Sequence, residues 1–244
     1  MTAELRTRLL ARYVSTHASV ATAAAEEGLA RRRPYLDRLV RDHFPPDRAA
    51  RILDLGCGHG AIVEAARRAG YQQVDGVDAS PEQVAAAAKL GIAGIRQGDL
   101  FEALEGLDPA SFDVIIVYDL LHYFGSEELL RIVDGVARAL KPGGRWIVHV
   151  PNGESPFAGR MRYWDCLATS AFTRASIAQL LLASGFASVR SFEDRPAPHG
   201  LKSLVRAGLW QVIRLGLRLY LMVETGERGE EAIFSQCLLA VAIK

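Results

Sequence analysis

The sequence predicts an α/β fold in which a doubly wound, mainly parallel sheet carries helices on both faces. Short apolar runs alternate with helical stretches of roughly 10 to 15 residues from residue 51 onward, which is the order of βαβ units. A glycine-rich turn follows the first apolar run, and ligands of such sheets bind where the strands end. The 244 residues are enough for a full core in one large domain or two small ones.

The elements follow in order from the periodicity. Residues 1–50 show apolar positions at helical spacing and are expected to be helical until Pro45 and Pro46. Ser80 is the expected N-cap of a helix that opens with Pro81. The expected strands span Arg51–Leu55, Gln73–Asp78, Ile92–Gln97, Phe112–Tyr118, Arg145–Val150, Ala187–Phe192 and Phe234–Ile243. The expected helices span Gly60–Gly70, Pro81–Leu90, Ser126–Leu140, Thr173–Ser184 and Leu201–Glu224.

Composition and charge exclude several classes of protein. Half of the residues are hydrophobic and 23% are charged, which disfavours a disordered, collagen-like or solenoid chain. Lys and Arg number 29 against 28 Asp and Glu, so the net charge is +1 and nothing indicates nucleic acid binding. Three scattered cysteines form no CxxC pair, and no secretory signal or long apolar run occurs. We therefore expect a cytoplasmic protein without disulfides, a zinc site or a simple transmembrane helix.

The strongest motif is the turn Asp54-Leu55-Gly56-Cys57-Gly58-His59-Gly60 at the end of the first strand. Glycines let the backbone turn tightly and approach a bound molecule at a helix N-terminus. Their spacing is GxGxG rather than the GxGxxG of dinucleotide-binding turns, and the turn holds an aspartate but no Lys or Arg. This pattern disfavours pyrophosphate binding and therefore a nicotinamide oxidoreductase.

Two more aspartates follow the next strands. Asp78 ends the second strand, where a ribose would present two hydroxyls to a carboxylate, and Asp99 follows the third strand. Alone, each aspartate is equally well explained as a turn or helix-cap residue. Because the carboxyl ends of parallel strands meet at one edge, Asp54, Asp78 and Asp99 together predict a ligand site there.

Five motifs in this order resemble the class I S-adenosylmethionine-dependent methyltransferases. The resemblance covers about Arg51 to Phe192 plus the last strand, and its motifs are residues 52–60, 76–80, 98–100, 112–115 and 140–144. It implies a Rossmann-like sheet of seven strands with the last one antiparallel. It also implies S-adenosylmethionine as cofactor and S-adenosylhomocysteine as product. A divalent metal stays open, since no paired-carboxylate motif specifies one.

The resemblance also implies the cofactor-binding residues. The glycines of the turn form the floor under the methionine part, with Asp54 near its cationic amino group. Asp78 holds the ribose hydroxyls, Asp99 and Leu100 lie at the adenine, and Tyr118 and Asp119 line the methionine end. The expected set is Asp54, Gly56, Cys57, Gly58, Gly60, Asp78, Ala79, Asp99, Leu100 and Tyr118.

Methyl transfer to a hydroxyl needs an aligned acceptor and a base for the departing proton. His149 is the preferred base because it interrupts an apolar strand near its carboxyl end and its ordinary pKa suits that role. His122 and Asp119, after the fourth strand, are the other candidates. Two alternatives stay open: His149 is a buried residue with a purely structural role, or His122 only shapes the cofactor pocket. His17 and His199 are expected on a covering surface.

Segments outside the motifs should select the acceptor. Asn152, Arg162, Tyr163 and Trp164 suit stacking and hydrogen bonding with a polyhydroxylated molecule, although a polar surface loop has the same composition. The turn at 150–152 and residues 198–202 and 233–236 resemble bacterial methyltransferases of glycan and lipopolysaccharide assembly. A sugar hydroxyl of a polysaccharide is therefore the preferred acceptor. The alternatives are a quinone, a lipid or a small natural product, or a cofactor-binding regulatory protein without catalysis.

A helical insertion precedes the last strand. Residues 196–223 contain no acidic residue, while Lys202, Arg206, Arg214 and Arg218 cover a helical arc of about 160°. Residues 200–224 form either a peripheral helix at a membrane surface or, as we prefer, a helix packed on the sheet or in a homodimer, with its Arg heads directed outward. We expect one methyltransferase domain over residues 1–244. Its parts are an N-terminal helical cover (1–50), a cofactor-binding core (51–194), the insertion (195–232) and the last strand (233–244).

Overall fold

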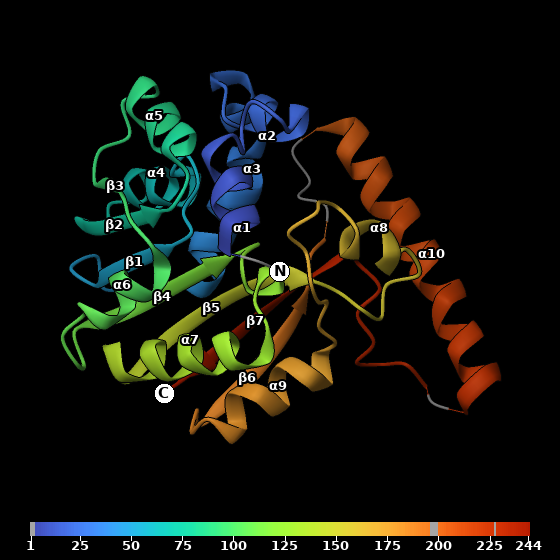
Figure 1. Cartoon of the computed structure of the whole chain (residues 1–244). Helices are drawn as coiled ribbons and strands as arrows, with labels where there is room; N and C mark the ends of the chain where they lie inside the picture. The colour runs from blue at the N-terminus through green and yellow to red at the C-terminus, as the bar shows by residue number, and fades with distance from the viewer. Residues whose placement is uncertain (1–2, 196–199, 227) are drawn as a thin grey trace.

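A computed structural model describes residues 3–195, 200–226 and 228–244 (Figure 1). Its strands are β1 (Arg51–Leu55), β2 (Gln73–Asp78), β3 (Ile95–Gln97), β4 (Phe112–Tyr118), β5 (Leu140–Pro151), β6 (Ser188–Glu193) and β7 (Cys237–Ile243). They form one seven-stranded sheet in the order β3-β2-β1-β4-β5-β7-β6. The first five strands pair in parallel, and β7 runs antiparallel to β5 and β6. This confirms the expected doubly wound sheet with an antiparallel last strand.

Helices cover both faces of the sheet (Figure 1). They are α1 (Ala3–Ala11), α2 (Ala18–Ala23), α3 (Glu26–His43), α4 (Ala61–Arg68), α5 (Pro81–Lys89), α6 (Leu100–Glu105), η1 (Leu121–Tyr123), α7 (Ser126–Ala139), α8 (Ala158–Arg162), α9 (Arg174–Ala183) and α10 (Leu201–Thr225). Buried residues of α3, α4 and α5 share one core cluster, and those of α6, α7 and α9 share the other.

Alternate residues of the central strands build these two clusters. On β4, Val114 and Ile116 face α3 and α4, while Ile115 and Val117 face α6 and α7. All four side chains are fully buried. A strand covered on both faces needs apolar residues at successive positions, which is why the run Phe112–Tyr118 is predictable to its exact ends from sequence.

Two short helices were not expected. They have six residues in α6 and five in α8, too few to show a helical period. In α6, the Asp99 carboxylate accepts a hydrogen bond from the backbone N–H of Phe101 at 2.8 Å, so this aspartate is a helix N-cap. The cap and a place on the cavity wall described below are compatible, because a carboxylate has further lone pairs.

The last strand begins at Cys237, three residues later than expected. Asn152, at the end of β5, is fully buried. Its side-chain amide donates to the carbonyl oxygens of Ile233 at 2.6 Å and Ser235 at 2.9 Å. These carbonyls are therefore satisfied by a side chain and not by a strand ladder.

The helix expected over residues 200–224 is present, but its expected packing on the sheet is wrong, and so is the outward direction of its Arg214 head. α10 lies at the periphery of the molecule and is not laid on the sheet (Figure 1). Arg214 is buried toward the body of the protein, and Arg218 donates to the backbone oxygen of Glu230 at 3.1 Å. Within the described ranges, no helix combines the length and the hydropathy needed to cross a bilayer.

Candidate functional site

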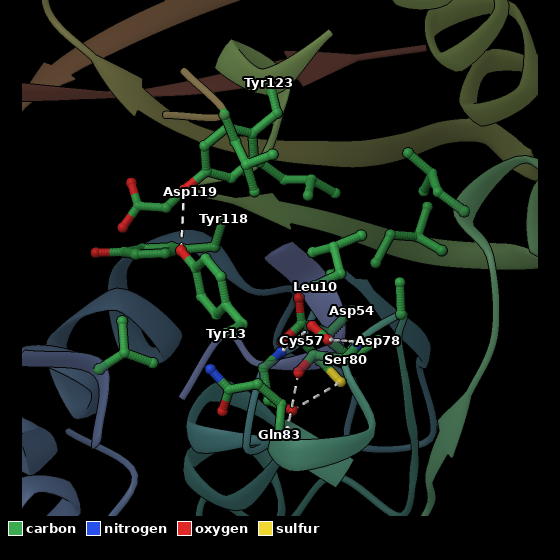
Figure 2. A pocket seen from close by; sticks show the side chains of 18 of the residues that line it. Leu10, Tyr13, Asp54, Cys57, Asp78, Ser80, Gln83, Tyr118, Asp119 and Tyr123 are labelled. Atoms are coloured by element: carbon green, nitrogen blue, oxygen red, sulfur yellow. Dashed lines mark hydrogen bonds between the residues drawn. The ribbon is translucent and has the colours of Figure 1, made fainter. Parts of the chain in front are cut away.

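A cavity of about 380 Å³ opens at the carboxyl ends of β1, β2 and β4. The strand order reverses between β1 and β4, so this is the position at which doubly wound sheets bind ligands. The volume suits a small-molecule site. Figure 2 shows Asp54, Cys57 and Asp78 grouped at one end and Tyr118 and Asp119 toward the other.

The glycine-rich turn forms part of the cavity wall. Gly56 and Gly58 have φ angles of 74° and 56°, a region that only glycine enters at no cost. A Cβ at Gly56 would lie 2.6 Å from the side chain of Leu120. Gly60 does not line the cavity, and a Cβ there would meet Ile95 at 3.0 Å. Two of the three glycines thus face the ligand, and the third lets the turn pack against the sheet.

Asp78 is held with its carboxylate toward the cavity. One oxygen accepts from the backbone N–H of Gly58 at 2.7 Å and the other from that of Ser80 at 2.8 Å. Burial raises the pKa of Asp78, and these two hydrogen bonds oppose the rise. Each oxygen keeps a lone pair for a further donor, so the carboxylate can accept two neighbouring hydroxyls of a ribose.

Asp54 has the most deeply buried carboxyl group on the cavity wall. The residue is 1% exposed, and within the described chain neither carboxylate oxygen has a hydrogen-bond partner. Burial, followed by the nearby charge of Asp78, raises its pKa to about 8. An unpartnered buried carboxylate is costly, and a ligand cation would supply the missing partner.

The residues of the expected cofactor site fit S-adenosylmethionine. Of the ten positions, all except Gly60 line the cavity. The orphaned Asp54 carboxylate suits the cationic amino group, and Asp78 suits the ribose diol. Gln83, whose side-chain oxygen is also buried without a partner among the described residues, was missed by the sequence analysis. The only feature of the sequence that could have indicated Gln83 is its position three residues after the N-cap Ser80.

The N-terminal helices close one side of the cavity. Arg6 pairs with Glu128 at the start of α7 at 2.8 Å. The hydroxyl of Tyr13 lies 3.0 Å from that of Tyr123, which donates to Asp165 at 2.9 Å. The contacts of Arg6 and Tyr13 join segments more than 100 residues apart in sequence, so motif spacing does not reveal them.

The candidate bases Asp119 and His149 form one hydrogen-bonded chain with Asp194. Nδ1 of His149 lies 2.6 Å from Asp119, and its Nε2 lies 3.5 Å from Asp194. Burial alone would lower the pKa of His149, but Asp119 and then Asp194 outweigh it and raise the pKa to about 9. The ring of Tyr118 stacks on the imidazole with centroids 4.0 Å apart. At neutral pH, His149 is therefore an imidazolium between two carboxylates.

Of the three residues Asp119, His149 and Asp194, only Asp119 lines the cavity. The side chain of His149 is 3% exposed and does not reach the cavity wall. The Asp119 side chain is 47% exposed, and its backbone has a φ of 54°. A left-handed conformation at a residue other than glycine carries strain and is typical of functional sites. Although partial burial would raise the pKa of Asp119, the charge of His149 lowers it. Asp119 therefore presents an ionised carboxylate to a ligand.

His122 also lines the cavity. The residue is 3% exposed, and its Nδ1 is buried without a hydrogen-bond partner in the described chain. Burial lowers its pKa and outweighs the opposing charges of Asp119 and Asp165. His122 is thus a neutral imidazole at the wall.

The four expected acceptor-binding residues are not brought together. Trp164 lines the cavity and stacks on His17 at 5.6 Å between ring centroids. Asn152 holds the backbone before β7, and the Arg162 guanidinium donates to backbone carbonyls within its own loop. Tyr163 is 78% exposed and lines no described cavity. His199 lies outside the described residues.

Whether the protein holds a divalent metal was left open by the sequence, and the candidate ligands include Asp119 and His149. Ligand atoms of Asp119, His149 and Cys237 lie within 4.8 Å of one another. His149 Nδ1 is already hydrogen bonded to Asp119, and burial raises the pKa of the Cys237 thiol. A thiolate and a free imidazole nitrogen are what a metal needs, so the hydrogen bond between the His149 imidazolium and the Asp119 carboxylate accounts for this geometry better than an ion.

A second, polar hollow of about 990 Å³ lies beside the edge strand β6. Tyr35, Arg38, Asp194 and Arg214 contribute to its lining, together with residues 230–233. Asp194 therefore connects this hollow to the imidazole of His149 from the side opposite Asp119.

The chain is similar to known methyltransferases. A family model described as a methyltransferase domain matches residues 29–191. The ubiquinone biosynthesis O-methyltransferase of Xylella fastidiosa is 38% identical over 111 residues, which cover 44% of each chain. The trans-aconitate 2-methyltransferase of Mycobacterium tuberculosis is 36% identical over 136 residues, 54% of this chain and 48% of the other. The chain thus spans about half the length of these curated relatives or less.

The same fold occurs in solved structures. A SAM-dependent methyltransferase from Archaeoglobus fulgidus superposes with a TM-score of 0.64 over 87% of this chain and 94% of the other. At 19% sequence identity, this likeness concerns the fold.

Proposed function

The chain belongs to the S-adenosylmethionine-dependent methyltransferase family, and we propose that it methylates a hydroxyl oxygen of a flat, largely apolar acceptor of the phenol or quinol class. The observation that carries this proposal is the half-exposed carboxylate of Asp119 on a cavity wall otherwise rich in aromatic rings. When bound, S-adenosylmethionine supplies a methyl group activated by its sulfonium. The protein's own residues must orient the acceptor and take its proton.

The aromatic side chains favour ring contacts over polar ones. The hydroxyls of Tyr13 and Tyr123 face each other, and the Tyr118 hydroxyl donates to Tyr35 at 3.0 Å. Their polar ends are therefore occupied, and Trp164 adds a further ring to the lining. A flat apolar acceptor fits such walls by stacking, whereas a sugar needs several free donors and acceptors.

Asp119 is the catalytic base of this proposal. An acceptor hydroxyl would donate a hydrogen bond to its carboxylate, which would hold the acceptor oxygen in place. When bound S-adenosylmethionine supplied its methyl group to this oxygen, the Asp119 carboxylate would take the hydroxyl proton. Such a placed base contributes roughly 10² to 10⁴ in rate.

His149 acts through Asp119 and is a positioning residue. Its imidazolium fixes the carboxylate rotamer by the 2.6 Å hydrogen bond and keeps Asp119 ionised. Asp194 in turn holds the imidazolium from the other side. This changes the order of the candidates, because His149 was preferred as the base from sequence.

The test is methyl transfer from labelled S-adenosylmethionine to an alkylated catechol and to a panel of sugars. We expect methylated catechol, and a loss of about 10² or more in kcat for Asp119→Asn with little change in S-adenosylhomocysteine affinity. Asp113→Asn, at the opposite end of β4, is the matched control and should retain its kcat. A fully active Asp119→Asn variant would transfer the role to His122.

The sugar acceptor preferred from sequence is the second candidate. The polar hollow beside Asp194 favours it, since charged side chains line that space. Methylation of a sugar but not of the catechol would support this candidate. The discriminating variant is Arg38→Ala in that hollow, which should then raise the KM for the sugar and leave catechol turnover unaffected.

A further inference from the structure

α10 exposes apolar side chains on a scale found nowhere else in the described chain. Eleven of the seventeen exposed large hydrophobic residues belong to this one helix. Leu201 is 79% and Val223 78% exposed, at opposite ends of the helix. The others are Leu204, Val205, Leu209, Val212, Ile213, Leu215, Leu219, Tyr220 and Met222. Soluble proteins rarely leave so large an apolar patch without a partner.

These residues form one continuous face. At 100° per residue they fill an outward arc of roughly 180°, and Lys202 is the only charged residue within it. The 25 residues give the face a length of about 37 Å. A two-stranded coiled coil needs only a narrow seam of apolar residues, so this arc is wider than one partner helix would cover.

The rotation of α10 is fixed by polar contacts on its inner side. Nε of Arg214 lies 2.8 Å from a carboxylate oxygen of Glu193, and Glu193 is itself 3% exposed. Glu193 also accepts from the backbone N–H of Phe234 at 3.2 Å. Turning the apolar face inward would bury Lys202 and break the Arg214 ion pair, which is costly for partly buried charges. The outward direction of the apolar face is therefore part of the fold.

The charge beside the N-terminal half of this face is positive. Lys202 and Arg206 are exposed in the first two turns, and Arg160 is exposed on α8. The first acidic residue of α10 is Glu224, in its last turn. Lys or Arg beside a broad apolar face is the pattern of helices that lie in a bilayer interface rich in anionic lipid.

We propose that α10 docks the enzyme on an anionic membrane surface, with its apolar face embedded at the level of the lipid headgroups. Phe157 and Tyr163, which flank α8, are also exposed. α8 and α10 lie on the same side of the molecule in Figure 1, away from α4 and α5. Trp164, next to Tyr163, lines the cavity. Docking through this side brings the part of the cavity around Trp164 near the lipid phase.

The test uses the full chain and does not depend on methyl transfer. We expect the protein to float with vesicles of equal parts phosphatidylglycerol and phosphatidylcholine, and to bind pure phosphatidylcholine more weakly. Val212→Glu and Leu219→Glu should each weaken binding about tenfold or more, since each removes an embedded apolar side chain. Lys202→Ala and Arg206→Ala should each weaken binding to the anionic vesicles by about fivefold.

Leu182→Glu is the matched control, because Leu182 is an exposed leucine on α9. It should leave vesicle binding unchanged, and all variants should keep their S-adenosylhomocysteine affinity. Failure of the native protein to float would overturn the proposal. A native dimer that Val212→Glu converts to a monomer, without vesicle binding, would instead assign the face to a second copy. Either result leaves the proposed reaction standing.

Discussion

Ionisation of Asp54 should control cofactor binding. Its carboxyl is buried without a partner in the described chain, and its pKa is raised to about 8 by burial and then by Asp78. An α-amino group has an ordinary pKa near 8. The pairing of this carboxylate with the amino group of the cofactor requires Asp54 to be ionised and the amine to be protonated.

The magnitude follows from these two fractions. At pH 8 each group is about half in the required form, so about a quarter of encounters are productive. At pH 6 the amine is protonated, but only about 1% of Asp54 is ionised. The affinity should therefore fall about 25-fold from pH 8 to pH 6, with release of nearly one proton on binding at the acid end. With an ordinary aspartate pKa, the affinity would instead rise about twofold.

Calorimetric titration of S-adenosylhomocysteine, which carries the same amino group, measures both quantities. Repeating it in buffers of different ionisation enthalpy gives the number of protons released. Asp54→Asn cannot ionise and should bind weakly, with little pH dependence. This variant separates Asp54 from Asp78, whose pKa is also raised. An affinity of the native protein that stays constant or increases as the pH falls would refute the reasoning.

Three further predictions concern the same site. Asp78→Ala should weaken S-adenosylhomocysteine binding about 10- to 100-fold by loss of the ribose hydrogen bonds; an unchanged Kd would contradict the ribose role. Gly56→Ala should cost about 1–2 kcal/mol of stability, because alanine is strained at a φ of 74°, and an unaltered melting temperature would count against this. His149, whose pKa is raised to about 9, contributes stability that is complete below its ordinary pKa and lost as the pH rises through 9. Denaturation at alkaline pH should therefore show a loss of about 3 kcal/mol that is absent in His149→Gln, and equal losses in both proteins would disprove it.

The sheet, and the gathering of the expected cofactor positions on one cavity wall, could be predicted because the sequence signals for them are local. The run Phe112–Tyr118 is apolar at successive positions, and the glycine turn and Asp78 each follow a strand directly. In a parallel sheet, such local positions converge at one edge without knowledge of any distant contact. This is why nine of the ten expected cofactor positions line one cavity.

The acceptor-binding and catalytic residues were less predictable, because several polar side chains among them form hydrogen bonds with residues distant in sequence. Asn152 is of a residue type that often binds ligands, yet its side-chain amide donates its hydrogen bonds to carbonyls more than 80 residues away. His149 looked like a base on an apolar strand, but Asp119 and then Asp194, which the sequence did not single out, make it a buried imidazolium. Neither partner can be identified by periodicity or by residue type.

The orientation of α10 could not be predicted from the sequence either. A helical pattern separates an apolar face from a basic one, but it does not tell which face meets the protein. The usual rule, apolar inward, fails here because Arg214 has a buried acidic partner in Glu193 and the apolar residues have none. One ion pair at the end of β6 therefore turns an ordinary amphipathic segment into an exposed apolar surface. Such a surface is unfavourable in water alone, and the proposed docking of α10 on a membrane would cover it.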